Sequence, residues 1–212
     1  MYKRKNRLLN NFIIFIIGKF GAKALVFLML PLYTSILTTS QYGDIDLITT
    51  TASLLLPIVT LGMSEAIFRF SMGKKYDKVQ VLFTGVVTGI LVFSLVAILL
   101  TIANFYIRWT YLSEMLLLLF TSILYEFFSN YIKATGKSVE FVLLGIIQTC
   151  VAVIGNILFL AYFRMGIKGY ILAYAISYVV PVFYVLLKEK LCRCFRLKLL
   201  EGSLFYAMLK YS

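Results

Sequence analysis

The chain has 212 residues, of which 61% are hydrophobic and 14% charged, and its mean hydropathy is +0.92. Soluble domains carry about a quarter charged residues, so a water-soluble fold of this length could not bury so much apolar surface. The formal net charge of +12 does not indicate a nucleic-acid binder, because the positive residues gather between apolar runs and do not follow an amphipathic groove. The composition therefore predicts a membrane protein.

Apolar runs of roughly 18 residues or more recur along the whole chain, and each is long enough to cross the hydrocarbon core as a helix. We expect six transmembrane helices, at residues 8–37, 45–72, 79–106, 113–135, 139–163 and 169–187. The first run is too long for a signal peptide and has no small-residue cleavage site. The predicted fold class is an all-α polytopic membrane protein whose residues 1–187 form one six-helix lobe.

Lysine and arginine are distributed unevenly over the connections between these runs. Fifteen of them lie in the N-terminal segment, the second and fourth connections and the C-terminal tail, whereas the other connections carry only Arg108, Arg164 and Lys168. Cytoplasmic connections are enriched in Lys and Arg. The bias therefore predicts that both termini are cytoplasmic.

Residues 188–212 are basic, and a new apolar run begins at residues 204–209. We interpret this part as a cytoplasmic segment followed by the start of a truncated seventh helix. Cys192 and Cys194 lie in the segment that we place in the cytoplasm, where thiols stay reduced. A Cys-x-Cys pair without histidine is weak support for a metal site, and the chain has no histidine, so no metal is expected.

Small residues and prolines inside the spans indicate how the helices pack. Gly85 and Gly89 have the small-xxx-small spacing that lets helices approach closely. Pro57 and Pro181 lie within spans, where they can kink a helix. These features favour a bundle with bent helices and do not identify a substrate.

Ionisable residues within the apolar runs are the most informative, because a charge in the membrane normally faces a partner, the bundle interior or a wet cavity. Lys19 and Lys23 are one helical turn apart, and Lys19 lies roughly 16 Å from the start of its span, beyond comfortable snorkelling distance. Glu65 and Arg69 are also one turn apart and could pair along the helix. Arg69 alone could snorkel to the cytoplasmic headgroups.

Glu126 and Gln148 fall at about the depth of Lys19, so the sequence predicts a polar layer in the cytoplasmic half of the bundle. One interpretation is a solvated cavity in which Lys19, Lys23 and Arg69 hold an anion such as a diphosphate. The other is that Lys19 or Arg69 only neutralises an acidic side chain across a helix interface. The residues themselves leave both interpretations open.

Several short sequence motifs are spread along the chain. They are Pro31-Leu32-Tyr33-Thr34, Tyr42-Gly43-Asp44-Ile45-Asp46-Leu47, Pro57, Leu61-Gly62, Ala66, Arg69-Phe70, Ala134-Thr135-Gly136-Lys137, Asn156, Gly166-Ile167-Lys168-Gly169 and Ala173. With them the chain resembles the Wzx-type polysaccharide flippases of the MOP superfamily, which also contains the MATE drug exporters and the lipid II flippase MurJ.

The resemblance implies a transporter that moves undecaprenyl-diphosphate-linked oligosaccharide across the bacterial plasma membrane for O-antigen, capsule or similar polysaccharide synthesis. It implies no enzyme activity and no cofactor, although transport could be coupled to H⁺ or Na⁺. The partners implied are the lipid-linked oligosaccharide and the bilayer. The resemblance implies Lys19, Lys23 and Arg69 as substrate-binding residues, and Asp44 and Asp46 match the family's acidic opening of the second helix. We predict Asp44 and Asp46, together with the intramembrane Glu65 and Glu126, as coupling or counter-ion groups.

Such flippases continue into a second lobe, so we expect this chain to be part of a longer protein or to pair with a second lobe or a copy of itself. An even number of spans would give parallel repeats about an axis along the membrane normal. The alternatives are a MATE-like multidrug exporter, a membrane enzyme of glycan assembly, and a non-catalytic fragment or assembly subunit.

Overall fold

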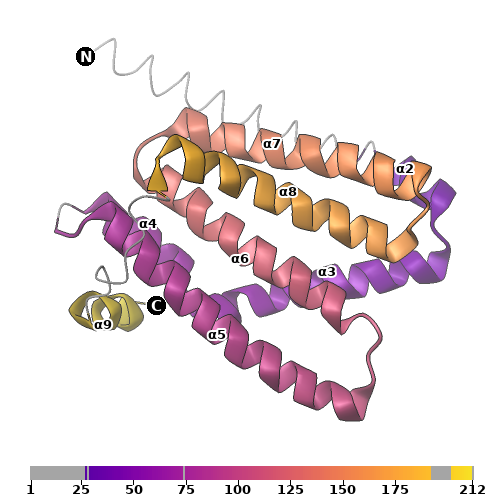
Figure 1. Ribbon diagram of the computed structural model, residues 1–212, viewed down its shortest axis with the longest axis horizontal. Coiled ribbons are helices and arrows are strands. Elements are labelled where there is room, and N and C mark those ends of the chain that lie inside the picture. Colours follow the sequence, from indigo (N-terminus) through magenta and orange to yellow (C-terminus); the bar gives the residue numbers. More distant parts are fainter. Residues whose placement is uncertain (1–26, 28, 74, 192–201, 212) are drawn as a thin grey trace.

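The protein was examined in a computed structural model, which describes residues 27, 29–73, 75–191 and 202–211. Every regular element in these residues is a helix (Figure 1). In chain order they are α2 (Leu30–Ile36), α3 (Thr39–Thr60), α4 (Met63–Met72), α5 (Lys78–Ile107), α6 (Leu112–Ala134), α7 (Ser138–Asn156), the π-helix η1 (Ile157–Tyr162), α8 (Gly166–Lys188) and α9 (Gly202–Tyr211).

Five of these helical segments are long and apolar enough to cross a membrane among the described residues, namely α3, α5, α6, α7 continued by η1, and α8. The all-α polytopic membrane fold predicted from the sequence is therefore confirmed. The first predicted span lies largely outside the described residues, and only its end is seen, as α2.

The second predicted span, residues 45–72, is wrong as a single helix. The chain breaks between α3 and α4, where Leu61 and Gly62 both adopt left-handed backbone conformations, with φ of 46° and 65°. Pro57 lies one turn before the break and has no N–H to continue the hydrogen-bond ladder. Apolar residues continue through the break, so the hydrophobic pattern does not reveal it.

The start of α3 was also placed too late. Thr38 and Gln41 form a capping box in which the Thr38 hydroxyl accepts from the Gln41 N–H and the Gln41 side chain accepts from the Thr38 N–H, at 3.3 and 3.0 Å. The helix therefore begins at Thr39. Asp44 and Asp46 lie inside it and do not form its first turn.

Helix α6 lies at the centre of the bundle. It packs against α3, α4, α5 and α8, and α7 packs on the other side of α8 (Figure 1). Phe127, Leu119 and Ile132 of α6 are almost fully buried. Among the five spans, α6 has the largest buried share and α5 the smallest.

Gly85 and Gly89 provide the close approach that their spacing predicts. A Cβ atom at Gly85 would lie 2.5 Å from Ile67 Cδ1 of α4, and one at Gly89 would lie 2.4 Å from Phe127 Cε2 of α6. The first half of α5 therefore docks against two neighbours through its glycine face. Helix α9 forms at the predicted apolar run and buries Leu204 and Met208 against α4 and α5.

The connections alternate between two ends of the bundle. Gly73, residues 75–77, residues 135–137 and the C-terminal end of α8 lie at one end, which we call the basic end (Figure 1). There Lys137 pairs with Glu189, and Lys188 pairs with Glu140 at 3.1 Å. At the opposite end, Lys168 of α8 lies 3.9 Å from Glu114 of α6. This arrangement agrees with the alternating charge bias of the sequence.

Candidate functional site

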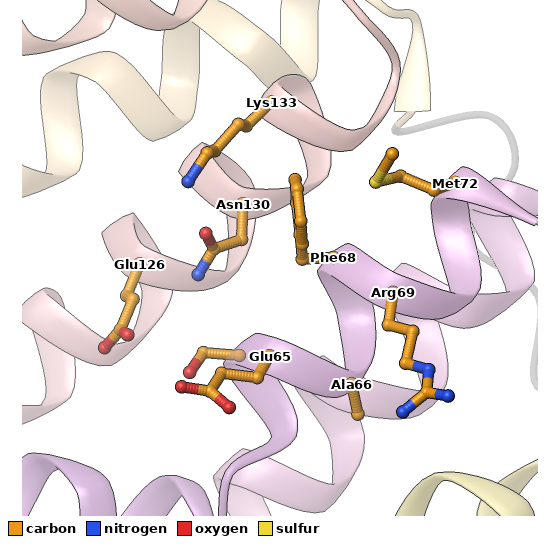
Figure 2. Close-up of a pocket in the computed structure, with 9 residues that line it drawn as sticks. Glu65, Ala66, Phe68, Arg69, Met72, Glu126, Asn130 and Lys133 are labelled. Carbon is orange, nitrogen blue, oxygen red and sulfur yellow. The ribbon is translucent and has the colours of Figure 1, made fainter. Parts of the chain in front are cut away.

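A cavity of about 650 Å³ lies between α4 and α6 at the basic end (Figure 2). Helix α4 contributes Glu65, Phe68 and Arg69 to its lining, and α6 contributes three polar residues described below. The break at Leu61 and Gly62 sets the direction of α4 separately from that of α3. The local backbone thus brings the charged face of α4 opposite α6.

The three α6 residues in the lining are Glu126, Asn130 and Lys133. Their spacing of i, i+4 and i+7 places them on one face of the helix. The opposite face of α6 carries buried aromatic side chains such as Phe128 and Tyr131. One helix therefore supplies both part of the core and a polar wall.

Two carboxylates meet in this cavity. Figure 2 shows the Glu65 and Glu126 side chains on the same side of the cavity, and the two interact electrostatically. The Ser64 hydroxyl interacts with the Glu126 carboxyl, and Glu126 Oε2 is buried without a hydrogen-bond partner among the residues that the structure describes. A cation or a hydrogen-bond donor beside these two carboxylates would therefore be stabilising.

Two cations line the same cavity. Lys133 Nζ lies 4.9 Å from the centre of the Phe68 ring and 5.8 Å from that of Phe141, contacts that hold the ammonium without neutralising it. The Arg69 guanidinium points to another side of α4 from the Glu65 carboxylate (Figure 2). Among the described lining residues, positive and negative charges are equal in number.

A second, smaller cavity of about 140 Å³ lies near the opposite end of the bundle. It is formed by α2, α3 and α8, and its lining includes Tyr33, Tyr42, Asp46, Thr49 and Tyr170. Three tyrosines and a single carboxylate thus line this cavity, together with the apolar Leu30 and Ile45. In the part of the chain that the structure describes, no three His, Cys, Asp or Glu residues are placed to bind a metal ion.

Comparison with protein families identifies the chain over nearly its whole length, since residues 8–212 match the family described as polysaccharide biosynthesis protein. The chain belongs to this family. No curated protein and no solved structure matches it. Membership confirms the resemblance at the level of the family, and with the apolar helices it makes this a membrane protein of polysaccharide synthesis.

The structure distributes the residues predicted for the family's transport site over different places. Arg69, Glu65 and Glu126 come together in the cavity between α4 and α6. Asp46 lines the smaller cavity near the opposite end, and Asp44 lies on α3 close by. Gln148 does not join Glu126, because its amide donates to Ser177 Oγ of α8 at 3.3 Å. Lys19 and Lys23 lie outside the described residues.

Asn130 and Lys133 were missed as site residues. Lys133 was counted only as part of a basic connection, and Asn130 was given no role. A signal existed, because both recur on the helical face of Glu126. However, this face meets α4 only because of the way the two helices cross. That crossing cannot be predicted from a single sequence.

Proposed function

We propose that the chain forms one lobe of a flippase that moves a lipid-linked oligosaccharide across the bacterial plasma membrane, with both termini in the cytoplasm. Membership of the polysaccharide biosynthesis family supports the biological role. The observation that carries the proposal is a charged cavity of about 650 Å³ between two helices of an apolar bundle. Charges in such surroundings call for water, a partner or a ligand.

In this proposal the cavity receives the diphosphate of the lipid carrier from the cytoplasmic leaflet. Arg69 offers forked hydrogen bonds and Lys133 a point charge. Lys19 and Lys23 remain proposed substrate-binding residues. Glu65 and Glu126 act as counter-ion or coupling groups for H⁺ or Na⁺, and Asp44 and Asp46 keep the coupling role implied by the resemblance.

Transport further requires a path between two lobes, so we propose that a second lobe or a copy of this chain covers the cavity. Alternating exposure of the cavity then moves the headgroup, and no bond of the substrate is made or broken. The protein is therefore a transporter and not an enzyme.

The experiment is to introduce Arg69→Ala, Lys133→Ala and Lys19→Ala into the gene in its native host. We expect loss of surface glycan and accumulation of carrier-linked oligosaccharide, with unchanged amounts of protein in the membrane. Lys75→Ala is the matched control, because Lys75 is an exposed lysine at the basic end but does not line the cavity. Normal glycan export in all three variants would reject the assigned roles.

A multidrug exporter is the second candidate, and the paired carboxylates favour it. Glu65 and Glu126 could bind an organic cation in the same cavity. Efflux of ethidium by wild-type cells that is lost in Glu126→Gln cells, with surface glycan unaffected, would support this function over the flippase.

A further inference from the structure

We infer that the smaller cavity between α2, α3 and α8 is a carbohydrate-binding subsite, which binds one sugar ring of the transported oligosaccharide. This inference rests on the proposed function. It adds that a sugar of the substrate is bound in the smaller cavity, at the opposite end of the bundle from the charged cavity. It gives Asp46 a role in sugar binding in addition to the coupling role proposed above.

The walls of this cavity are aromatic and firmly packed. The Tyr33 ring is 5% exposed and meets the Tyr170 ring edge to face, with centroids 5.4 Å apart and planes at 70°. Tyr170 in turn packs on Tyr174 at 4.7 Å. Tyr33 and Tyr170, which both line the cavity, therefore form a preorganised aromatic surface. Tyr42, 42% exposed, lies at its open side.

Tyrosine provides what a sugar ring requires, because its apolar face packs on the C–H face of the ring and its hydroxyl donates and accepts hydrogen bonds. The Thr49 hydroxyl already donates to the Ile45 and Asp46 carbonyls, at 2.9 and 3.2 Å, so its oxygen is left to accept. The Asp46 carboxylate has two oxygens and can accept from two hydroxyl groups at once. The cavity thus combines apolar faces with acceptors for sugar hydroxyls.

The position of Asp46 explains why it needs a ligand or water. It lies seven residues into α3, roughly 10 Å along the helix axis from Thr39. Its side chain is exposed on the lobe, and the ion pairs between described residues involve other acidic groups. A carboxylate at this depth that faced lipid would be strongly unfavourable. It therefore faces an aqueous path in which sugar hydroxyls can reach it.

The size of the cavity favours a single ring. Its volume of about 140 Å³ is well below the roughly 300–1,000 Å³ of pockets for drug-sized ligands. An organic cation is the competing ligand, since aromatic rings and a carboxylate also attract cations. The hydroxyl-rich lining and the family's link to polysaccharide synthesis favour the sugar.

The test measures binding of two kinds of probe to the purified protein in lipid nanodiscs, namely bare undecaprenyl diphosphate and the same carrier bearing an oligosaccharide of glucose, galactose or N-acetylglucosamine that is long enough to extend from the charged cavity to the opposite end of the bundle. We expect the wild type to prefer at least one glycosylated carrier. Tyr42→Ala and Asp46→Asn should each reduce that preference about three- to tenfold while leaving binding of the bare carrier unchanged. Tyr42→Phe, which keeps the ring, should retain most of it.

Tyr106→Ala is the control, because Tyr106 is an 82% exposed tyrosine of α5 far from this cavity. A wild type that binds both carriers equally would overturn the sugar subsite and leave the proposed function standing. Binding of neither carrier would reject both. A preference that survives in Tyr42→Ala and Asp46→Asn, or ethidium binding that depends on Asp46 without any sugar preference, would also overturn the subsite.

Discussion

Helices α3 and α5 both expose one face on the surface of this lobe, but the two faces differ in chemistry. The exposed surface of α3 mixes the polar Tyr42, Asp46, Thr50 and Ser53 with the apolar Leu47, Leu54 and Ile58, whereas that of α5 carries mainly large apolar residues from Leu91 to Ile107. The mean hydropathies of the two spans are 1.2 and 2.7. Acyl chains tolerate the second surface, whereas the Asp46 carboxylate makes its side of the first unfavourable in lipid.

This difference between α3 and α5 indicates which side of the lobe faces lipid. The outer half of α5 is suited to acyl chains, because most of its exposed side chains are apolar and the exposed Ser94 and Thr101 hydroxyls donate to carbonyls of their own helix. The α3 face needs water, a ligand or another protein surface. We therefore place the transport path along α3 and α4 and the bilayer along α5.

The largest effect is expected when a charge is placed in the middle of each face. Leu95→Asp on α5 should destabilise the membrane-inserted protein by about 3 kcal/mol, because the carboxylate would face acyl chains. Thr50→Asp, at the middle of α3, should leave its stability close to that of the wild type. Both are measured as the fraction of monodisperse protein after detergent extraction and heating. Equal losses in the two variants would remove the distinction between the faces.

A smaller loss of stability is expected at the inner face of α5, which packs against α4 and α6. Gly89→Val should destabilise the fold by about 1–3 kcal/mol, since its Cβ would overlap the Phe127 ring. Gly145→Val on α7 is the control, because no atom lies within 4 Å of a Cβ placed there. Thermal melts of the two purified variants would compare them. A Gly89 variant as stable as the Gly145 variant would mean that α5 packs through another face.

The smallest effect concerns the break that separates α3 from α4. Gly62→Ala should destabilise the protein by about 1 kcal/mol, because alanine is disfavoured at a φ of 65°. Gly43→Ala, a helical position with open space around the added Cβ, should be neutral or slightly stabilising. Melting temperatures measured side by side decide this. A Gly62 variant that gains stability would indicate one continuous helix.

The fold could be predicted from the sequence wherever the signal was the apolar run itself. The spans that became α5, α6, α7 with η1, and α8 were located closely, because their length and hydropathy are local properties. The break at Leu61 could not be foreseen, since a leucine in the left-handed region follows from tertiary packing and not from propensity. The capping box at Thr38 could have been found from its Gln41 partner.

The candidate site was predictable only in part. Glu65, Arg69 and Glu126 stand out as charges in apolar runs, and the structure brings them together. Asp46 of α3 and Tyr170 of α8 are far apart in the sequence but line the same cavity. No local pattern gives that contact, so the aromatic cavity emerged from the tertiary arrangement alone.

The most direct test of the account is the water accessibility of the two faces. Thr50→Cys and Leu95→Cys are made in a chain whose Cys150, Cys192 and Cys194 are replaced by serine, and each is reconstituted in vesicles and treated with a charged, membrane-impermeant thiol reagent. If α3 lines an aqueous path and α5 faces lipid, the cysteine at position 50 reacts readily and the one at position 95 hardly at all. Equal reactivity, or faster reaction at position 95, would contradict an aqueous path along α3.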